Sequence, residues 1–144
     1  MKKYTLEDFK DFAVVDGRVQ CPGGDYSGID SFPDSCSFGE WCSFGKSCSF
    51  GEWCSFGEWC SFGEWCSFGG GCVICENKML DNFIRSVSGL GDNKRTLYLW
   101  NTENGWFAQA GCFFGSESEF VDAVNRKYGK DHQYIKALDF LKTL

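Results

Sequence analysis

Residues 32–73 read FPDSCS FGEWCS FGKSCS FGEWCS FGEWCS FGEWCS FGGGCV, which is seven consecutive hexads without slippage. An aromatic residue opens every hexad, and a thiol occupies its fifth position. The aromatic positions are Phe32, Phe38, Phe44, Phe50, Phe56, Phe62 and Phe68, and the thiol positions are Cys36, Cys42, Cys48, Cys54, Cys60, Cys66 and Cys72. Short repeats of fixed period build solenoids, in which each unit completes the core of its neighbours.

The hexad itself indicates a short strand followed by a corner. A period of six fits neither a helix of period 3.6 nor a simple alternating strand. In Trp-Cys-Ser-Phe-Gly, Cys and Phe stand two residues apart and therefore share one face, while Ser points to the other. The Gly that follows can take a positive φ at the corner, and we expect Glu and Trp to lie on the turn facing solvent.

This repeat resembles the hexapeptide motif of left-handed β-helices, in which an apolar residue, a Gly or acidic residue and a small residue recur at fixed places. The resemblance covers 42 residues and implies three hexads in each triangular coil. Phe stands where that family prefers Ile, Leu or Val, and the wider core that Phe needs leaves a pentapeptide-like or right-handed solenoid as the alternative. We predict a mainly β fold with α/β caps, built on a short hexapeptide β-solenoid and left-handed by preference.

The flanking segments are predicted to close the open ends of the solenoid, because such ends expose strand edges and core. We expect one compact unit in three parts: residues 1–31 as an N-terminal helical cap and lead-in, residues 32–75 as the solenoid, and residues 76–144 as an α/β C-terminal cap. Residues 5–15 have the pattern of a short amphipathic helix capped by Thr5.

A hairpin is predicted in the C-terminal part. The runs RTLYLWN and GWFAQAG are strand-like and flank Asn104-Gly105, a strong turn signal. Residues 79–86 are expected to form a short helix or strand. Residues 112–115, Cys-Phe-Phe-Gly, echo the repeat, so we expect them to add a strand beside it.

Two helices are predicted at the end of the chain. Ser116 and Glu119 form a capping box for a helix that runs to about Tyr128, where Gly129 stops it. A last helix is expected from Asp131 through Leu144. Its predicted apolar face consists of Tyr134, Ile135, Leu138 and Leu141.

Composition and charge restrict the function classes. The chain has 144 residues and a net charge of -6, which argues against direct binding to nucleic acid phosphates. Its apolar runs are too short for a membrane span, and acidic residues stand where a signal peptide would carry its apolar segment. Seven of the ten Cys residues occupy the small inward position of the repeat, where Cys acts as a buried hydrophobe. We therefore expect reduced thiols and a cytoplasmic protein.

The tail and the hexads together resemble a group of small proteins encoded in bacteriophage and prophage genomes. The resemblance rests on the run RTLYLWNTENGWFAQAGCFFG and on the C-x-F-G-E hexads that precede it. It bears on the origin of the chain and implies no particular reaction.

The corner residues of the repeat are the predicted partner-binding residues. With 18 residues in each turn, Glu40 stacks with Glu58, Trp41 stacks with Trp59, and Lys46 stacks with Glu64. Exposed Trp beside an acidic stripe is unusual on a soluble surface and is typical of binding hot spots. The predicted site residues are Glu40, Trp41, Glu52, Trp53, Glu58, Trp59, Glu64 and Trp65.

A rigid rod with regular carboxylates suggests imitation of duplex DNA, which carries one negative charge per roughly 1.7 Å of axis. We expect a non-enzymatic, phage-derived binding protein that inhibits a host DNA-binding defence complex of the anti-CRISPR or anti-restriction kind. Its partner would be a host protein with a basic surface in the bacterial cytoplasm. The alternative is a structural or assembly module that self-associates, as a homodimer for example, through exposed aromatics or the solenoid end.

Catalytic and metal sites are weighed and not adopted. Many left-handed β-helix proteins are acyltransferases that use a His beside the solenoid, but the one histidine here, His132, lies near the last predicted helix. Cys72-x-x-Cys75 has zinc-knuckle spacing, and Cys21 and Cys112 lie off the repeat phase, so four sulfurs converging on a structural metal stay an open alternative. We predict no enzyme activity and no cofactor.

Overall fold

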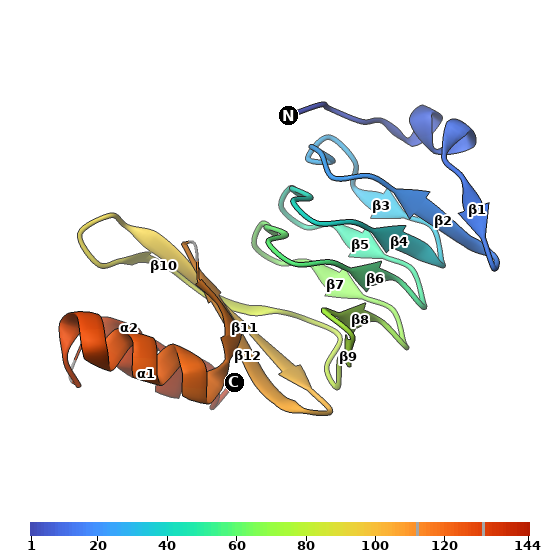
Figure 1. The fold of residues 1–144 in the computed structure, drawn as a ribbon. Helices are drawn as coiled ribbons and strands as arrows, with labels where there is room; N and C mark the ends of the chain where they lie inside the picture. Colours follow the sequence, from blue (N-terminus) through green and yellow to red (C-terminus); the bar gives the residue numbers. More distant parts are fainter. Residues whose placement is uncertain (112, 131) are drawn as a thin grey trace. The chain divides into compact units, whose positions relative to one another are not determined.

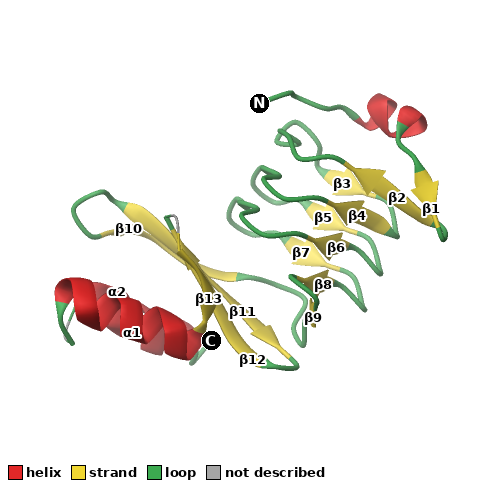
Figure 2. Cartoon of the chain, in the orientation of Figure 1, coloured by secondary structure: helices red, strands yellow, loops and turns green. Residues whose placement is uncertain are grey.

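The computed structural model describes residues 1–111, 113–130 and 132–144 of the chain, and it divides them into two compact units, Met1–Phe83 and Ile84–Leu144 (Figure 1). The protein is mainly β, as predicted: small parallel sheets form the first unit, and an antiparallel sheet with two helices forms the second (Figure 2). None of the helices in the described residues is long and apolar enough to cross a membrane.

Short parallel strands build the first unit in the layered manner of a β-solenoid. One sheet has the order β1-β2-β4-β6-β8-β9, and a second has the order β3-β5-β7. Isolated parallel bridges join Lys3, Asp25, Ser43 and Ser61 along a third line. The strands are β1 (Val14–Val15), β2 (Arg18–Cys21), β3 (Ser31–Phe32), β4 (Cys36–Phe38), β5 (Ser49–Phe50), β6 (Ser55–Phe56), β7 (Ser67–Phe68), β8 (Val73–Ile74) and β9 (Asn77–Lys78).

The coils pair at a register of 18 residues, which confirms three hexads per turn. Ser37 of β4 pairs with Ser55 of β6, and Ser49 of β5 pairs with Ser67 of β7. The layering also includes β2, upstream of the hexads, since Val19 pairs in parallel with Cys36. The regular coils therefore begin before Phe32, although the hexad pattern itself does not.

The Phe side chains fill the interior in two geometries at once. Within a column, rings from successive coils are nearly parallel: the centroids of Phe32 and Phe50 lie 4.9 Å apart at 9°. Between columns, rings meet edge to face, as Phe38 and Phe44 do at 4.9 Å and 88°. Offset-stacked and edge-to-face contacts are the two arrangements that the quadrupole of an aromatic ring favours. The predicted inward positions of Phe and Cys are confirmed, and all of them are buried.

The corner glycines are required by close packing, and the prediction that they supply positive φ is wrong. None of the glycines that follow Phe in the hexads has a positive φ. A Cβ on Gly63 would instead lie 2.6 Å from the carbonyl carbon of Gly45 and the nitrogen of Lys46 in the preceding coil, and a Cβ on Gly45 would lie 2.7 Å from the Ser27 oxygen. The residue two positions later takes the positive φ.

A short helical segment closes the N-terminal end of the first unit. It is a 3-10 helix, η1 (Leu6–Asp11), whose start is fixed by the Thr5 N–H donating to the Asp8 carboxylate at 2.7 Å. The Phe9 ring packs against Tyr26 at 6.0 Å and Phe32 at 6.2 Å, so it covers the first layer of the core. The predicted helix over 5–15 is too long, because residues 14–15 form β1.

The C-terminal end of the first unit is closed by its own chain. β9 folds back antiparallel on β8, which protects the outer edge of the six-stranded sheet. The Phe68 N–H of β7 donates to the Asn82 carbonyl at 2.8 Å, and Ser67 bridges to Phe83. Covering an edge in this way removes a row of backbone groups that would otherwise pair with another chain. A cap over the solenoid from residues 84–144 stays a prediction.

A four-stranded antiparallel sheet, β10-β11-β12-β13, forms the base of the second unit. The predicted hairpin is confirmed: β11 and β12 pair from Leu97–Ala110 to Thr102–Gly105, and Gly105 has φ +100°. Of the segment 79–86, only its last two residues join a strand. The strands are β10 (Arg85–Leu90), β11 (Arg95–Thr102), β12 (Gly105–Ala110) and β13 (Phe113–Ser116).

The echo of the repeat at residues 112–115 does not extend the solenoid. Phe113 and Phe114 lie in β13, which pairs antiparallel with β12 of the second sheet. The prediction of a strand beside the repeat is therefore wrong for these residues, and Cys112 lies outside the described residues. A single Phe-Gly echo cannot specify the partner of a strand, because pairing depends on which face it buries.

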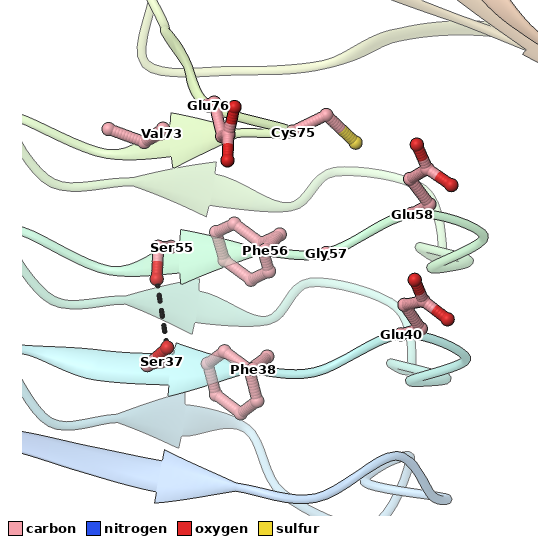
Figure 3. Close-up of a pocket in the computed structure, with 10 residues that line it drawn as sticks. All are labelled: Ser37, Phe38, Glu40, Ser55, Phe56, Gly57, Glu58, Val73, Cys75 and Glu76. Carbon is pink, nitrogen blue, oxygen red and sulfur yellow. Dashed lines mark hydrogen bonds between the residues drawn. The ribbon is translucent and has the colours of Figure 1, made fainter.

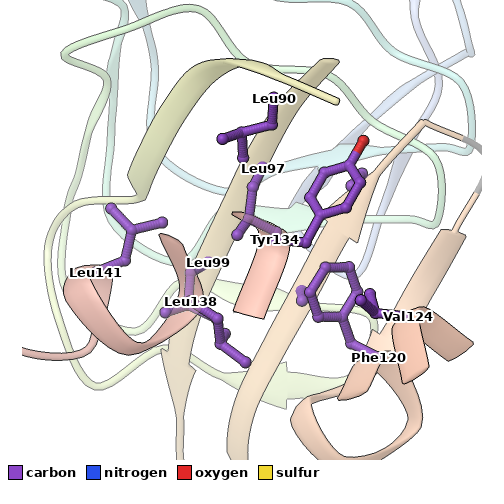
Figure 4. Close-up of a cluster of buried hydrophobic side chains, with 10 residues drawn as sticks. Leu90, Leu97, Leu99, Phe120, Val124, Tyr134, Leu138 and Leu141 are labelled. Carbon is purple, nitrogen blue, oxygen red and sulfur yellow. The ribbon is translucent and has the colours of Figure 1, made fainter. Parts of the chain in front are cut away.

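Two helices cover one face of this sheet and enclose its core (Figure 4). α1 (Glu117–Tyr128) has the predicted capping box and ends at Gly129, with φ +96°. α2 (Gln133–Leu141) is capped by His132 and is shorter than the predicted helix, whose expected start, Asp131, is not among the described residues. The buried side chains are Leu90, Leu97, Leu99, Ala108, Ala110, Phe120, Val124, Tyr134, Leu138 and Leu141.

Replacing Gly63 with Ala tests the close approach of coils. We expect Gly63→Ala to lower the free energy of unfolding by about 1–3 kcal/mol or more, because backbone atoms of the preceding coil cannot move aside cheaply. The measurement is denaturant unfolding followed by circular dichroism. Gly70→Ala is the matched control, since a Cβ there would meet nothing within 4 Å. Equal stability of the two variants would contradict the packing of coils at this corner.

Candidate protein-binding surface

The repeat forms three columns of corners, each named here by its acidic residue in the middle coil. The Glu58 corner contains Glu40–Trp41, Glu58–Trp59 and Cys75–Glu76. The Glu52 corner contains Asp34–Ser35, Glu52–Trp53 and Gly70–Gly71. The Glu64 corner contains Lys46–Ser47 and Glu64–Trp65. All eight predicted site residues therefore lie at corners, distributed over three columns.

The second residue of each corner is held in the left-handed region of the backbone map. Trp41, Trp53, Trp59 and Trp65 have φ between 62° and 65°. The reason is a hydrogen bond between coils: the Trp41 N–H donates to the Glu58 carbonyl at 3.1 Å, and the Trp53 N–H donates to the Gly70 carbonyl at 2.9 Å. The corner geometry thus continues the ladder of backbone hydrogen bonds around the turn.

Tryptophan is an unfavourable residue for this backbone conformation. A left-handed φ costs a residue with a Cβ roughly 1–2 kcal/mol, and Gly or Asn are the types that tolerate it best. The chain does place Gly at the equivalent position 71, with φ +75°. Backbone strain of this kind at an exposed position supports a functional hypothesis for the side chain.

The Trp side chains project from the corners as predicted. Trp41 and Trp53 are more than half exposed, and Trp65 is 82% exposed. Trp41 and Trp59 lie face to face, with ring centroids 5.7 Å apart and planes 15° apart, which confirms the predicted stack. The Glu58 corner thereby presents a pair of parallel indole rings.

The corner carboxylates are exposed beside these rings. Glu40, Glu52, Glu58 and Glu64 are all exposed, and within the described residues none of them takes part in an ion pair. The Asp34 carboxylate differs, since it accepts a hydrogen bond from the Glu52 N–H at 2.8 Å and so helps to fix its corner. The predicted corner carboxylates are thus available to a partner.

A groove of about 450 Å³ runs beside the Glu58 corner (Figure 3). Ser37, Ser55 and Val73 line it from three successive strands, and the Ser55 hydroxyl donates to the Ser37 hydroxyl at 3.2 Å. Glu40 and Glu58 project in the same direction from successive corners, as Figure 3 shows. Glu76 and Cys75 enter from the β8–β9 turn.

The pKa of Cys75 reports how closely these carboxylates gather. Burial, followed by the nearby negative charges of Glu58, Glu76 and Glu40, raises the pKa of the Cys75 thiol to about 12. Two of these three acids were predicted as site residues. Glu76 was missed, although it stands 18 residues after Glu58, because the hexad pattern ends before it. Counting by coils instead of by hexads would have found it.

The Cys residues form columns inside the solenoid and do not gather at a metal site. The nine described thiols are unbridged. Cys36, Cys54 and Cys72 stack in consecutive coils, and Cys21 lies below Cys36. Cys21 and Cys72 are therefore separated by two layers of thiols, so they cannot share a metal with Cys75. Cys112 lies outside the described residues, and no group of potential ligands occurs in the part of the chain that the structure describes.

His132 has a structural place in the second unit. Its Nδ1 accepts the Tyr134 N–H at 3.2 Å and so caps α2, while its ring stacks on Tyr128 at 4.2 Å. All nine described Cys residues belong to the first unit. The geometry within each unit thus offers no thiol positioned beside an imidazole, the pairing that nucleophilic catalysis by Cys requires.

Alkaline pH tests the burial of the thiol columns. Burial raises the pKa of Cys48 from 9.0 to about 11 and that of Cys75 to about 12. Because these folded-state pKa values exceed that of an unfolded thiol, the stabilisation is complete below pH 9 and is lost as the pH rises from 9 toward 12. Unfolding midpoints between pH 8 and pH 11 should fall, and Cys48→Ala should show a smaller fall. Midpoints that stay constant would contradict buried thiols.

Substitutions at Trp65 test the corner conformation. We expect Trp65→Asn to keep or raise stability by up to about 1 kcal/mol, because Asn tolerates a left-handed φ and this side chain is mostly exposed. Trp65→Val should be less stable than Trp65→Asn by about 1 kcal/mol or more, since a β-branched residue is disfavoured there. Denaturant midpoints of the two variants give the comparison. Equal midpoints would show that the corner is not left-handed in solution.

Comparisons with protein-family models, with curated proteins and with solved structures find no match to this chain. The fold itself is shown by the coordinates: a mainly β chain with solenoid-like parallel layers, a C-terminal hairpin sheet and two helices. The function has to be argued from the corners of the first unit.

Proposed function

We propose that this chain is a non-enzymatic binding protein of phage origin that engages a basic surface of a host protein through its Glu and Trp corners. The proposed target is a DNA-binding defence complex of the anti-CRISPR or anti-restriction type in the bacterial cytoplasm, whose DNA-binding surface would be occupied. The left-handed winding of the hexapeptide-repeat family is part of the same proposal. Direct binding to nucleic acid is not proposed, because the charge is of the wrong sign.

The observation that carries the proposal is the exposure of strained Trp beside unpaired carboxylates. Trp41, Trp53 and Trp65 lie at solvent-exposed positions where the backbone disfavours them. Large aromatics supply most of the binding energy at many protein interfaces, and exposed acids supply steering toward a basic partner. Folding alone would be served better by Gly or Asn at these three positions.

The charge distribution supports a partner for the first unit. Residues 1–83 contain thirteen Asp and Glu against six Lys and Arg, so they carry a net charge of -7. Residues 84–144 contain seven Asp and Glu against eight Lys and Arg, a net charge of +1. The negative charge of the chain therefore belongs to the solenoid unit, where it raises the association rate with basic surfaces.

The middle coil approaches the charge density of DNA. It places Glu52, Glu58 and Glu64 at its three corners. With strands about 4.8 Å apart, three charges per coil correspond to one per about 1.6 Å of axis, close to the value for duplex DNA. The neighbouring coils are less acidic, since Lys46 and Gly70 occupy corners there. The imitation would therefore cover a short stretch of a DNA-binding channel.

Self-association is the second candidate, and the exposure of Trp65 favours it. An indole that is 82% exposed is a natural contact for another copy of the chain. A homodimer or larger assembly built on such aromatics would depend little on salt, because its contacts are apolar. Salt dependence therefore separates the two candidates.

Affinity capture from a bacterial host lysate tests the proposal. We expect the tagged chain to capture a DNA-binding complex at about 0.05 M salt and to release it at about 0.5 M salt, where charges are screened over a few ångströms. Duplex DNA should compete for the captured complex. The variant Glu40→Gln/Glu52→Gln/Glu58→Gln/Glu64→Gln should capture none of it, because the corner charges are gone.

Two results would contradict the DNA-site proposal. One is capture that persists with the four-Gln variant or in the presence of excess duplex DNA. The other is recovery of the bait alone as a salt-resistant oligomer, which would support the assembly candidate. Circular dichroism of the four-Gln variant serves as the folding control, since all four replaced side chains are exposed.

A further inference from the structure

We infer that the Glu58 corner, with its stacked indoles and the adjoining groove, is the recognition surface among the three corners, and that it takes arginine side chains from an extended basic segment of the partner. This inference rests on the proposed function and narrows it to one corner and one type of side chain. The argument starts from the aromatic pair and uses the charges to identify the occupant.

The Glu58 corner is where the structure shows two corner indoles stacked on each other. Trp41 and Trp59 form the parallel pair, with Trp41 58% exposed. Eighteen residues before Trp41 the chain has Gly23, which offers no side chain to continue the stack. At the other corners each Trp stands beside small neighbours in its column: Ser35 and Gly71 for Trp53, and Ser47 for Trp65. The pair thus presents the largest ordered aromatic face of the three corners.

Carboxylates recur at this corner in three coils, whereas they are interrupted or already engaged at the others. Glu40, Glu58 and Glu76 all line the groove, and their charges act together on the Cys75 thiol. Lys46 stands in the Glu64 column. At the Glu52 corner, the Asp34 carboxylate is engaged with the Glu52 N–H. The unshared negative charge is therefore largest beside the indole pair.

The floor of the groove is neutral and already bonded. Arg18 donates to the Ser55 hydroxyl at 3.0 Å, and Ser55 donates to Ser37, so the hydroxyl row is held from one end. With acids along one side, a row of hydroxyls below and a volume of about 450 Å³, the groove fits a narrow cationic chain. An extended segment crossing the coils matches this shape better than a bulky folded surface.

Arginine fits this surface better than lysine. Its guanidinium is planar, so it can lie flat on an indole while its N–H groups donate in the same plane to carboxylates beside it. The ammonium of lysine is compact and strongly hydrated, and it makes no such flat contact. Because indoles and carboxylates alternate along this corner, a partner side chain that satisfies both should be selected.

Binding of short synthetic peptides tests the inference with the full-length chain. The probes are an oligo-arginine and an oligo-lysine of about six residues, about 20 Å long when extended, at about 0.1 M salt. Fluorescence anisotropy of the labelled peptide gives the affinities. We expect the wild-type chain to bind oligo-arginine at least about threefold more tightly than oligo-lysine, and Trp41→Ala to remove that preference.

Two charge-matched triple variants locate the site. Glu40→Gln/Glu58→Gln/Glu76→Gln should weaken oligo-arginine binding at least about tenfold, because the acceptors beside the indoles are lost. Asp34→Asn/Glu52→Gln/Glu64→Gln removes the same number of charges from the other corners and should weaken it less than about threefold. Far-ultraviolet circular dichroism and unfolding midpoints of both variants verify that each is folded.

Each other outcome is decisive. Equal weakening by the two triple variants would overturn the assignment to one corner and leave the proposed function standing, with the charge spread over all corners. A wild-type chain that does not distinguish the two peptides would overturn the assignment to arginine. Binding that is unaffected by either triple variant would overturn both the inference and the charge-based function.

Discussion

The stacking of Phe on Phe between coils is the contact on which the rest of the solenoid depends. Rings 18 residues apart lie nearly parallel at 4.9–5.3 Å in the columns of Phe32 and Phe38. Rings of neighbouring columns meet near 90° at 4.9 Å. An insertion of one residue would move a Phe to the outer face and break both contacts, so the strict period of the hexads follows from this core.

The same register sets the conformation of the corners. Once the rings are stacked, the backbone of one coil must approach the next closely enough for corner hydrogen bonds, such as that from the Ser47 N–H to the Glu64 carbonyl at 2.7 Å. Gly63 is then needed because its Cα faces the backbone of the preceding coil, and the residue two positions later is driven to positive φ. Strain at Trp is therefore a consequence of core packing and is tolerated because the core over-determines it.

The sequence predicted what the period controls and missed what depends on tertiary context. The inward Phe and Cys, the 18-residue turn and the Trp41–Trp59 stack all follow from counting. The role of Gly63 was mistaken, because φ preference and lack of space select the same residue type. Residues 14–15 and 113–116 were misplaced, since the strand that accepts a short edge strand is decided by long-range pairing that local pattern does not encode. Glu76 was overlooked because the site extends one coil beyond the repeat.

The corners are where the fold restricts side chains least and where this sequence departs most from the fold's preference. The first corner position accepts Asp34, Glu40, Lys46 or Gly70 with the same backbone path, so its charge is not dictated by packing. The second accepts Ser, Gly or Trp, yet the middle coil carries Trp at all three corners despite the cost of a left-handed φ. Residues that the core does not require, and that the backbone disfavours, have to be explained by what they contact outside the chain. The middle coil is therefore the part of the solenoid whose sequence is best explained by a partner.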